Sequence, residues 1–302
     1  MPRIRALLVG INEVDGSSPA YAGLGIPTLA GAVNDAVQLA GVYLHSGVDE
    51  VRTLLDGEAE RDAILWELLN AARQLVAGDT YLLHFSGHGF RGLPRPIGAD
   101  QWLTPEPGTG WIAHDGPITD GDLYGMLSFF RTGVRVVITS DSCHSGQVVR
   151  PEVSRAIRRE RYRRAVPRGL TDDQVGRLHA NLASRDGEAD PPWRGHRPEH
   201  VPTAAVALLA ACGVEETALD LDDGLDGQPH GLFSSCLLDA LSADPTRSIV
   251  AMQEAVYRAV RSRASAVGHE QGPRLYPLGD PVEAATLCRS RLLPSGAVTE
   301  VA

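Results

Sequence analysis

The strongest constraint on the fold is an alternation of short apolar runs with helical patterns. Four nearly continuous apolar runs lie at residues 5–11, 81–85, 134–139 and 204–211. Runs of this kind, without polar alternation, are typical of parallel strands buried on both faces. Helical patterns accompany them at residues 28–44, 63–75, 120–130, 232–241 and 250–266. The alternation predicts an α/β/α sandwich with a mostly parallel central sheet.

The amino-acid composition excludes several classes of catalytic and binding chemistry. The 302 residues include 28 arginines and no lysine, which excludes Schiff-base catalysis by lysine and a Walker-type phosphate loop. The apolar runs fall far short of the roughly 20 residues that span a bilayer. The first of them lacks a signal-type cleavage site. The four cysteines form no CxxC pair, so neither a disulfide framework nor a zinc ribbon is expected. We expect a cytoplasmic protein with no membrane partner.

Charge is distributed unevenly along the chain. The net charge is −10, yet residues 150–168 carry eight arginines against two glutamates, a local charge of +6. Residues 185–202 hold four prolines and two glycines, which is typical of a flexible connector. We interpret 148–202 as an insertion between two halves of one domain, 1–147 and 203–302. A solvated helix explains the arginines simply. Nucleic-acid binding is disfavoured because the acidic remainder would repel a polyanion.

Two of the predicted strands run into residues that can support nucleophilic catalysis. The second strand leads to His88 and Gly89, and the third leads to Cys143. Ligands of parallel sheets bind beyond the carboxyl ends of the strands. Thiolate attack on a carbonyl needs a base and backbone N–H groups directed at the oxyanion, and these three residues supply both. Each residue alone fits a structural role equally well, but their joint placement favours catalysis.

Seven short segments distributed along the chain carry a further signal. They read ALLVGIN (6–12), GAVNDA (31–36), HFSGHG (84–89), DSCHSG (141–146), LLAAC (208–212), GLFSSCLLDAL (231–241) and QGPRL (271–275). Together these segments resemble the caspase-like cysteine peptidases of family C14, in particular the metacaspase and prokaryotic caspase-homologue branch. The resemblance implies the caspase-haemoglobinase fold, a large-subunit-like half at 1–147 and a small-subunit-like half at 203–302. It implies a His88–Cys143 dyad, with Gly89 assisting the oxyanion hole.

The resemblance also implies a pocket for the residue before the scissile bond, lined by Asp35, Asp141 and Ser86. In this branch the pocket selects arginine or lysine, where true caspases select aspartate. The charges alone point the same way, since two converging carboxylates can receive a guanidinium by forked hydrogen bonds. Structural roles remain open, for Asp35 as an acid at a helix N-terminus and for Asp141 as a turn residue.

Metal ions and cofactors are not expected. Many metacaspases bind calcium through a segment of the form I-x-D-D-x-(I/L), but residues 118–123 read ITDGDL, and Arg150 stands where the family has a carboxylate. We therefore predict no calcium requirement. His84 and His88 do not form a zinc pair, because residues four apart on a strand are separated by roughly 13 Å.

Six acidic residues gather in a short segment after the fourth apolar run. They are Glu215, Glu216, Asp220, Asp222, Asp223 and Asp226. A solvated acidic loop accounts for such a cluster. The alternative is a docking surface for a basic substrate or for the chain's own arginine-rich connector.

These observations lead to one functional expectation and one alternative. We expect an endopeptidase that cleaves proteins or peptides after arginine. We also expect it to be zymogen-like, with its connector cut by itself or by an upstream protease. The family further implies a role in prokaryotic defence or programmed death. The alternative is a caspase-like interaction module whose dyad is incidental.

Overall fold

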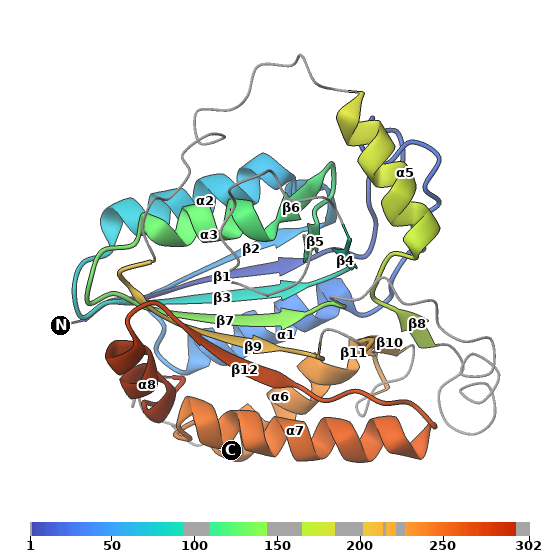
Figure 1. Cartoon of the computed structure of the whole chain (residues 1–302). Helices are drawn as coiled ribbons and strands as arrows, with labels where there is room; N and C mark the ends of the chain where they lie inside the picture. Colours follow the sequence, from blue (N-terminus) through green and yellow to red (C-terminus); the bar gives the residue numbers. More distant parts are fainter. Residues whose placement is uncertain are drawn as a thin grey trace.

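The computed structural model describes residues 2–92, 109–143, 165–184, 202–213, 216–221 and 227–293. A six-stranded sheet lies between two layers of helices (Figure 1). Its strands, in spatial order, are β12 (Arg274–Leu278), β9 (Ala205–Ala210), β7 (Arg135–Asp141), β3 (Thr80–Ser86), β1 (Ile4–Gly10) and β2 (Glu50–Leu55). Every neighbouring pair is parallel except β12 and β9. The predicted fold class is therefore confirmed.

Alternate side chains of the sheet build two separate cores. On β1, Ala6 and Leu8 pack into one core, whereas Leu7 and Val9 pack into the other. The first core is covered by α1 (Ala32–His45), α6 (Leu232–Ala243), α7 (Ile249–Ala266) and part of α8 (Pro281–Arg289). The second is covered by α2 (Arg61–Gln74) and α3 (Asp120–Ser128). Because each strand is apolar on both sides, its sequence reads as a continuous apolar run.

Helix starts follow local hydrogen bonding. A capping box between Thr119 and Asp122 begins α3 at Asp120, where the helical pattern of residues 120–130 predicts the start of the helix. The predicted start of α1 at residue 28 is wrong, because the helix begins at residue 32. The N–H groups of Ala30 and Gly31 donate to the Asp220 carboxylate instead of joining the helix.

Two strands of the main sheet are missing from the sequence prediction. Both β2 and β12 are edge strands, so they are only half buried and lack a continuous apolar run. The chain positions β2 through parallel pairing with β1, and β12 through antiparallel pairing with β9.

Short elements gather beyond the carboxyl ends of the parallel strands (Figure 1). One small sheet consists of β4 (Gly89–Arg91), β5 (Thr109–Ile112) and β6 (Pro117–Thr119). Another consists of β8 (Ala165–Pro167), β10 (Leu219–Leu221) and β11 (His230–Gly231). A short 3-10 helix, η1 (Asp56–Glu58), follows β2. The predicted ligand-binding edge of the main sheet is thus enclosed by small sheets from both halves of the chain.

The predicted connector, 148–202, is described only in part. Its residues 165–184 form β8 and α5 (Asp172–Ala183), which pack on the rest of the molecule. The other seven arginines of the basic run lie outside the described residues, as do 185–201. Within the part of the chain that the structure describes, no helix is both long and apolar enough to cross a membrane.

Candidate active site

Neighbouring strands bring the predicted catalytic residues to one place. Ser86 at the end of β3 pairs in register with Asp141 at the end of β7. Cys143 follows two residues later, and Gly89 begins β4. A Cβ atom on Gly89 would lie 1.8 Å from the carbonyl oxygen of Cys143. Only glycine therefore allows the His88–Gly89 backbone to pass this close to the cysteine.

His88 is held in a defined protonation state. Its Nε2 atom lies 2.7 Å from the carbonyl oxygen of Pro27, and since a carbonyl only accepts, Nε2 carries the hydrogen. Burial lowers the pKa of His88 to about 4, so the ring is neutral at pH 7. Its Nδ1 atom is buried and has no hydrogen-bond partner among the residues that the structure describes. His88 thus presents a free lone pair, as a general base requires.

The Cys143 thiol is occupied by a backbone contact. Its Sγ atom accepts a hydrogen bond of 3.0 Å from Ala218 N. Because His88 Nδ1 has no partner, the thiol is not bonded to that nitrogen in this structure. Transfer of the thiol proton to His88 requires Sγ to turn away from Ala218.

A connector residue, Arg168, crosses the site next to the thiol. Its carbonyl oxygen accepts hydrogen bonds from Gly89 N at 2.9 Å and from Cys143 N at 3.1 Å. Two backbone N–H groups converging on one carbonyl oxygen beside a cysteine have the arrangement of an oxyanion hole.

The chain around Arg168 is extended. Upstream, β8 pairs antiparallel with β10, and Arg168 N donates to Ala218 O at 3.0 Å. Downstream, Gly169 pairs in parallel with Gly89. Strand pairing on both sides of one residue is how sheets commonly bind an extended peptide.

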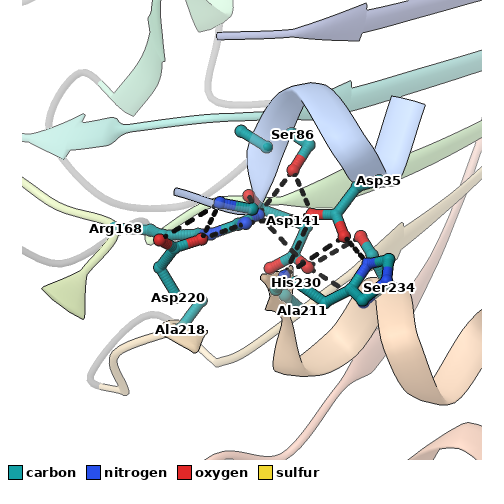
Figure 2. Close-up of polar contacts among 12 residues, drawn as sticks. Asp35, Ser86, Asp141, Arg168, Ala211, Ala218, Asp220, His230 and Ser234 are labelled. Carbon is teal, nitrogen blue, oxygen red and sulfur yellow. Dashed lines mark hydrogen bonds and ion pairs between the residues drawn. The ribbon is translucent and has the colours of Figure 1, made fainter. Parts of the chain in front are cut away.

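The side chain of Arg168 is completely buried among carboxylates (Figure 2). Its Nη2 atom donates to Asp35 at 2.9 Å and to Asp220 at 2.6 Å. Its Nη1 atom lies 3.3 Å from an Asp141 carboxylate oxygen and donates to Ser86 Oγ at 2.5 Å. All three residues predicted to line the specificity pocket therefore surround this guanidinium.

Charge balance decides the ionisation of this cluster. Burial lowers the pKa of Arg168, but Asp141, Asp220 and Asp35 outweigh it, and the net pKa lies above its ordinary value. Burial raises the pKa of Asp35, but Arg168, together with hydrogen bonds from His230 and Ser86, brings it below the ordinary value. Arg168 and Asp35 are therefore both charged.

Asp141 behaves differently from Asp35. Burial, reinforced by the nearby Asp35 charge, raises the pKa of Asp141 to about 6 despite the attraction of Arg168. Its Oδ2 atom accepts from Ser234 N and Oγ, but its Oδ1 atom is buried without a partner. Asp141 is thus the carboxylate that acid neutralises within the physiological range.

The sequence prediction did not place Asp220, His230 or Gly231 in the site. Asp220 belongs to the acidic cluster, of which only Glu216 and Asp220 lie among the described residues. It binds Arg168 of the connector, as the docking alternative for that cluster expected, and not water. His230 Nδ1 lies 2.8 Å from Asp35. A Cβ atom on Gly231 would lie 2.1 Å from Asp141 Oδ2 and 2.6 Å from Arg168 Cζ. Glycine is therefore required there for the pocket to accept a guanidinium.

The segment expected to lack calcium ligands has a structural role in this protein. Asp122 accepts hydrogen bonds from Thr119 N and Oγ1 and pairs with Arg61 at 3.0 Å. Its carboxylate caps α3 and neutralises an arginine. Arg150, the other residue behind this expectation, lies outside the described residues. Independence from calcium and other cofactors stays a prediction.

Comparison with known proteins places the chain in a family. Residues 4–151 match the family "Metacaspase, peptidase C14 domain". Metacaspase-1 of Lodderomyces elongisporus is 23% identical over 301 residues, covering 87% of this chain and 63% of that protein. Metacaspase-7 of Arabidopsis thaliana is 30% identical over 162 residues, covering 48% of this chain and 35% of that protein. These matches support the assignment of the chain to the caspase-like cysteine peptidases of family C14.

Two further comparisons bear on fold and activity. The crystal structure of protein GSU0716 from Geobacter sulfurreducens has a TM-score of 0.71 and 23% identity, and the match covers 96% of this chain and 98% of that one. It supports the fold alone. A relative named Inactive metacaspase-4, from Trypanosoma brucei brucei, is 25% identical over 76% of this chain and 58% of its own length. The chain thus spans 35% to 63% of these curated relatives, and its activity has to be argued from its own residues.

Proposed function

We propose that this protein is a cysteine endopeptidase that cleaves after arginine, and that its first substrate is its own Arg168–Gly169 bond. One observation carries the proposal. Arg168 combines a guanidinium bound by three carboxylates with a carbonyl oxygen bound by the N–H groups of Gly89 and Cys143. A single residue thereby satisfies the pocket and the oxyanion hole together, as a bound substrate does.

The reaction follows from the protonation states. The Cys143 thiol gives its proton to His88 Nδ1, and the thiolate attacks the carbonyl carbon of Arg168. The N–H groups of Gly89 and Cys143 stabilise the oxyanion. Collapse breaks the bond between the Arg168 carbonyl carbon and Gly169 N, and His88 protonates the departing amine. Water, deprotonated by His88, then hydrolyses the thioester and leaves a carboxylate on Arg168.

The pocket favours arginine over both lysine and aspartate. The two terminal nitrogens of the guanidinium are 2.5–2.9 Å from Ser86 on one side and from Asp35 and Asp220 on the other. The single ammonium of lysine cannot occupy both positions. An aspartate side chain would meet three carboxylates and be repelled.

We further propose that cleavage after Arg168 activates the enzyme toward other proteins and requires neither a metal ion nor a cofactor. Engagement of Asp122 with Thr119 and Arg61 supports the second point. An upstream protease would cut the same connector in trans. The family associates such activation with defence and programmed death, and we extend that role to this protein as part of the proposal.

A matched pair of proteins tests the function. The intact mass and new N-termini of the full chain and of Cys143→Ala are followed with time, with and without a chelator. Wild type is expected to yield a new N-terminus at Gly169 at the same rate in both conditions, and Cys143→Ala to stay uncut. Fluorogenic peptides ending in Arg, Lys or Asp then give the specificity. Preference for Asp, or activity that survives Cys143→Ala, contradicts the proposal, whereas a folded chain without any activity supports the interaction module.

A further inference from the structure

The residues after the Arg168–Gly169 bond, its primed side, are also held by contacts with the body of the enzyme. Leu170 N donates a 3.1 Å hydrogen bond to Gly89 O. Gly89 N donates to Arg168 O, so one residue of β4 pairs with the chain on both sides of the bond. The backbone after the bond is thus fixed by the same strand that contributes to the oxyanion hole.

An apolar pocket encloses the Leu170 side chain. Leu170 is 1% exposed and belongs to a cluster with Tyr21, Phe90 and Ile112, which are themselves fully buried. The Tyr21 hydroxyl donates to Ala113 O at 2.7 Å, which fixes the ring. The wall of the pocket therefore comes from the body of the enzyme, and a charged side chain in this position would be buried without a partner.

The helix that follows extends this recognition. A capping box between Thr171 and Gln174 begins α5 directly after Leu170. Val175 and Leu178 are buried in the same apolar cluster, whereas most of the helix is exposed. Apolar positions three residues apart, followed by Leu182, are the pattern of a helix that binds through one face.

Polar side chains of α5 bind backbone carbonyls of the loop at residues 20–25. Gln174 Nε2 donates to Leu24 O and Gly25 O at 3.1 and 3.2 Å. Asn181 Nδ2 donates to Ala20 O and Ala22 O at 3.1 and 3.0 Å. Successive carbonyl groups of an extended chain point in opposite directions. The loop therefore needs turns to direct these four carbonyls toward α5, and Gly23 and Gly25 provide them with φ of 72° and 58°.

We propose that the enzyme carries a primed-side binding site, whose occupant in the uncut chain is residues 169–183. The site selects substrates with a small residue and then leucine after the cleaved arginine, followed by an amphipathic helix. This inference rests on the proposed function. Hydrolysis changes none of the contacts of Leu170 or α5, so after cleavage the segment stays bound and competes with other substrates until it leaves.

Quenched peptides test the site separately from the function. All share Ala-Val-Pro-Arg and continue with Gly-Leu, Gly-Met or Gly-Asp, and a coumarin amide of the same four residues has no primed side. The enzyme is the full chain after self-cleavage. We expect cleavage of the amide, a kcat/KM for the leucine peptide about tenfold above that for the aspartate peptide, and a methionine peptide close to leucine. Equal rates for all peptides, with the amide cleaved, overturn the site and leave the function standing. No cleavage of the amide overturns both.

Self-cleavage provides a second measurement. Leu170→Asp is expected to slow the appearance of the Gly169 N-terminus about tenfold, while Leu170→Met stays within a few-fold of wild type. Ala180→Asp places the same charge on an exposed position of α5 and is expected to cut at the wild-type rate. Equal rates for Leu170→Asp and Ala180→Asp contradict the proposal, and a circular dichroism spectrum checks that each variant is folded.

Discussion

The two sides of the Arg168–Gly169 bond are recognised by opposite kinds of interaction. Before the bond, a fully buried cation meets three carboxylates contributed by α1, β7 and β10. After it, a leucine fills an apolar pocket and a largely exposed helix binds backbone carbonyls. Loss of one partner from a buried ion pair costs about 3–5 kcal/mol, whereas a single neutral hydrogen bond is worth about 1 kcal/mol. Under the proposed function, charge should determine which bond is cut, and the primed side should adjust the rate of cleavage.

The largest effect is expected from removing the cation. Arg168→Ala deletes the guanidinium that binds Asp35, Asp141 and Asp220, so the cut at this position should be lost, with a rate at least about 100-fold lower. Arg168→Lys keeps the charge but not the fork and should be intermediate. Intact-mass analysis over time measures both. If Arg168→Ala is cut after residue 168 at the wild-type rate, recognition of the residue before the bond does not depend on charge.

Removing single carboxylates should have the next largest effect. Asp220→Asn leaves Arg168 with two acidic partners and weakens the contacts to Ala30 N and Gly31 N. From the cost of breaking a buried pair, kcat/KM for arginine peptides should fall about 100-fold, mostly through KM. Asp239→Asn is the control, since Asp239 forms a half-exposed pair with Arg263 and should have no effect. If the two variants have equal kinetics, Asp220 does not contribute to the binding of arginine peptides.

Acid should weaken the charged side selectively. The pKa of Asp141 is raised to about 6, so its negative charge is present above that pH and lost as the pH falls through it. Without the arginine the pKa lies higher still, because Arg168 lowers it. KM for arginine peptides should therefore rise, by at most about tenfold per pH unit, as the pH falls toward about 6, and should level off below it. His88, with its pKa at about 4, stays neutral there, so kcat changes less.

A variant of the acid experiment identifies the titrating group. Asp141→Asn should bind arginine peptides weakly at every pH and lose the acid dependence of KM. Steady-state kinetics between pH 5 and 8 for wild type and variant make the comparison. An unchanged acid limb in Asp141→Asn would assign the titration to another group.

The smallest effect is expected on the primed side. Thr171→Ala removes the cap of α5 and should cost about 1 kcal/mol, which corresponds to roughly fivefold faster hydrogen exchange in that helix. Ser248→Ala removes the corresponding cap of α7 and should leave α5 unchanged. Exchange measured by mass spectrometry compares them. If α5 in Thr171→Ala exchanges as in wild type, the helix does not depend on its own cap.

Features set by local sequence could be predicted, and those set by distant pairing could not. Short stretches of sequence determine the buried strands and the capping box at Thr119. They also place the His88–Gly89 segment next to Cys143, because each follows one of two neighbouring strands. Arg168 is one of eight arginines in its segment, and its place in the pocket follows from the pairing of β8 with β10, two segments far apart in the sequence. Nothing near His230 signals its bond to Asp35.

One missed element did leave a signal in the sequence. Val175, Leu178 and Leu182 have helical spacing, and Thr171 with Gln174 forms a capping box. Because 148–202 was interpreted as an insertion with a flexible connector, the sequence prediction did not include this helix. For the acidic cluster the sequence left two alternatives open, a solvated loop and a docking surface for the connector, and Asp220 fits the second because it binds Arg168. Composition gives the charge of a segment but not which of its members is buried.

Arg168 also acts as a clamp between the two halves of the chain. Asp35 and Asp141 belong to the first half and Asp220 to the second, and the cation holds all three together. If the connector is cut as proposed and Arg168 leaves, the three carboxylates lose the guanidinium that binds them until another arginine arrives. A ligand that binds only the folded state stabilises it in proportion to its concentration. The activated enzyme would then be most stable against unfolding while substrate is bound, and it would unfold first when substrate runs out.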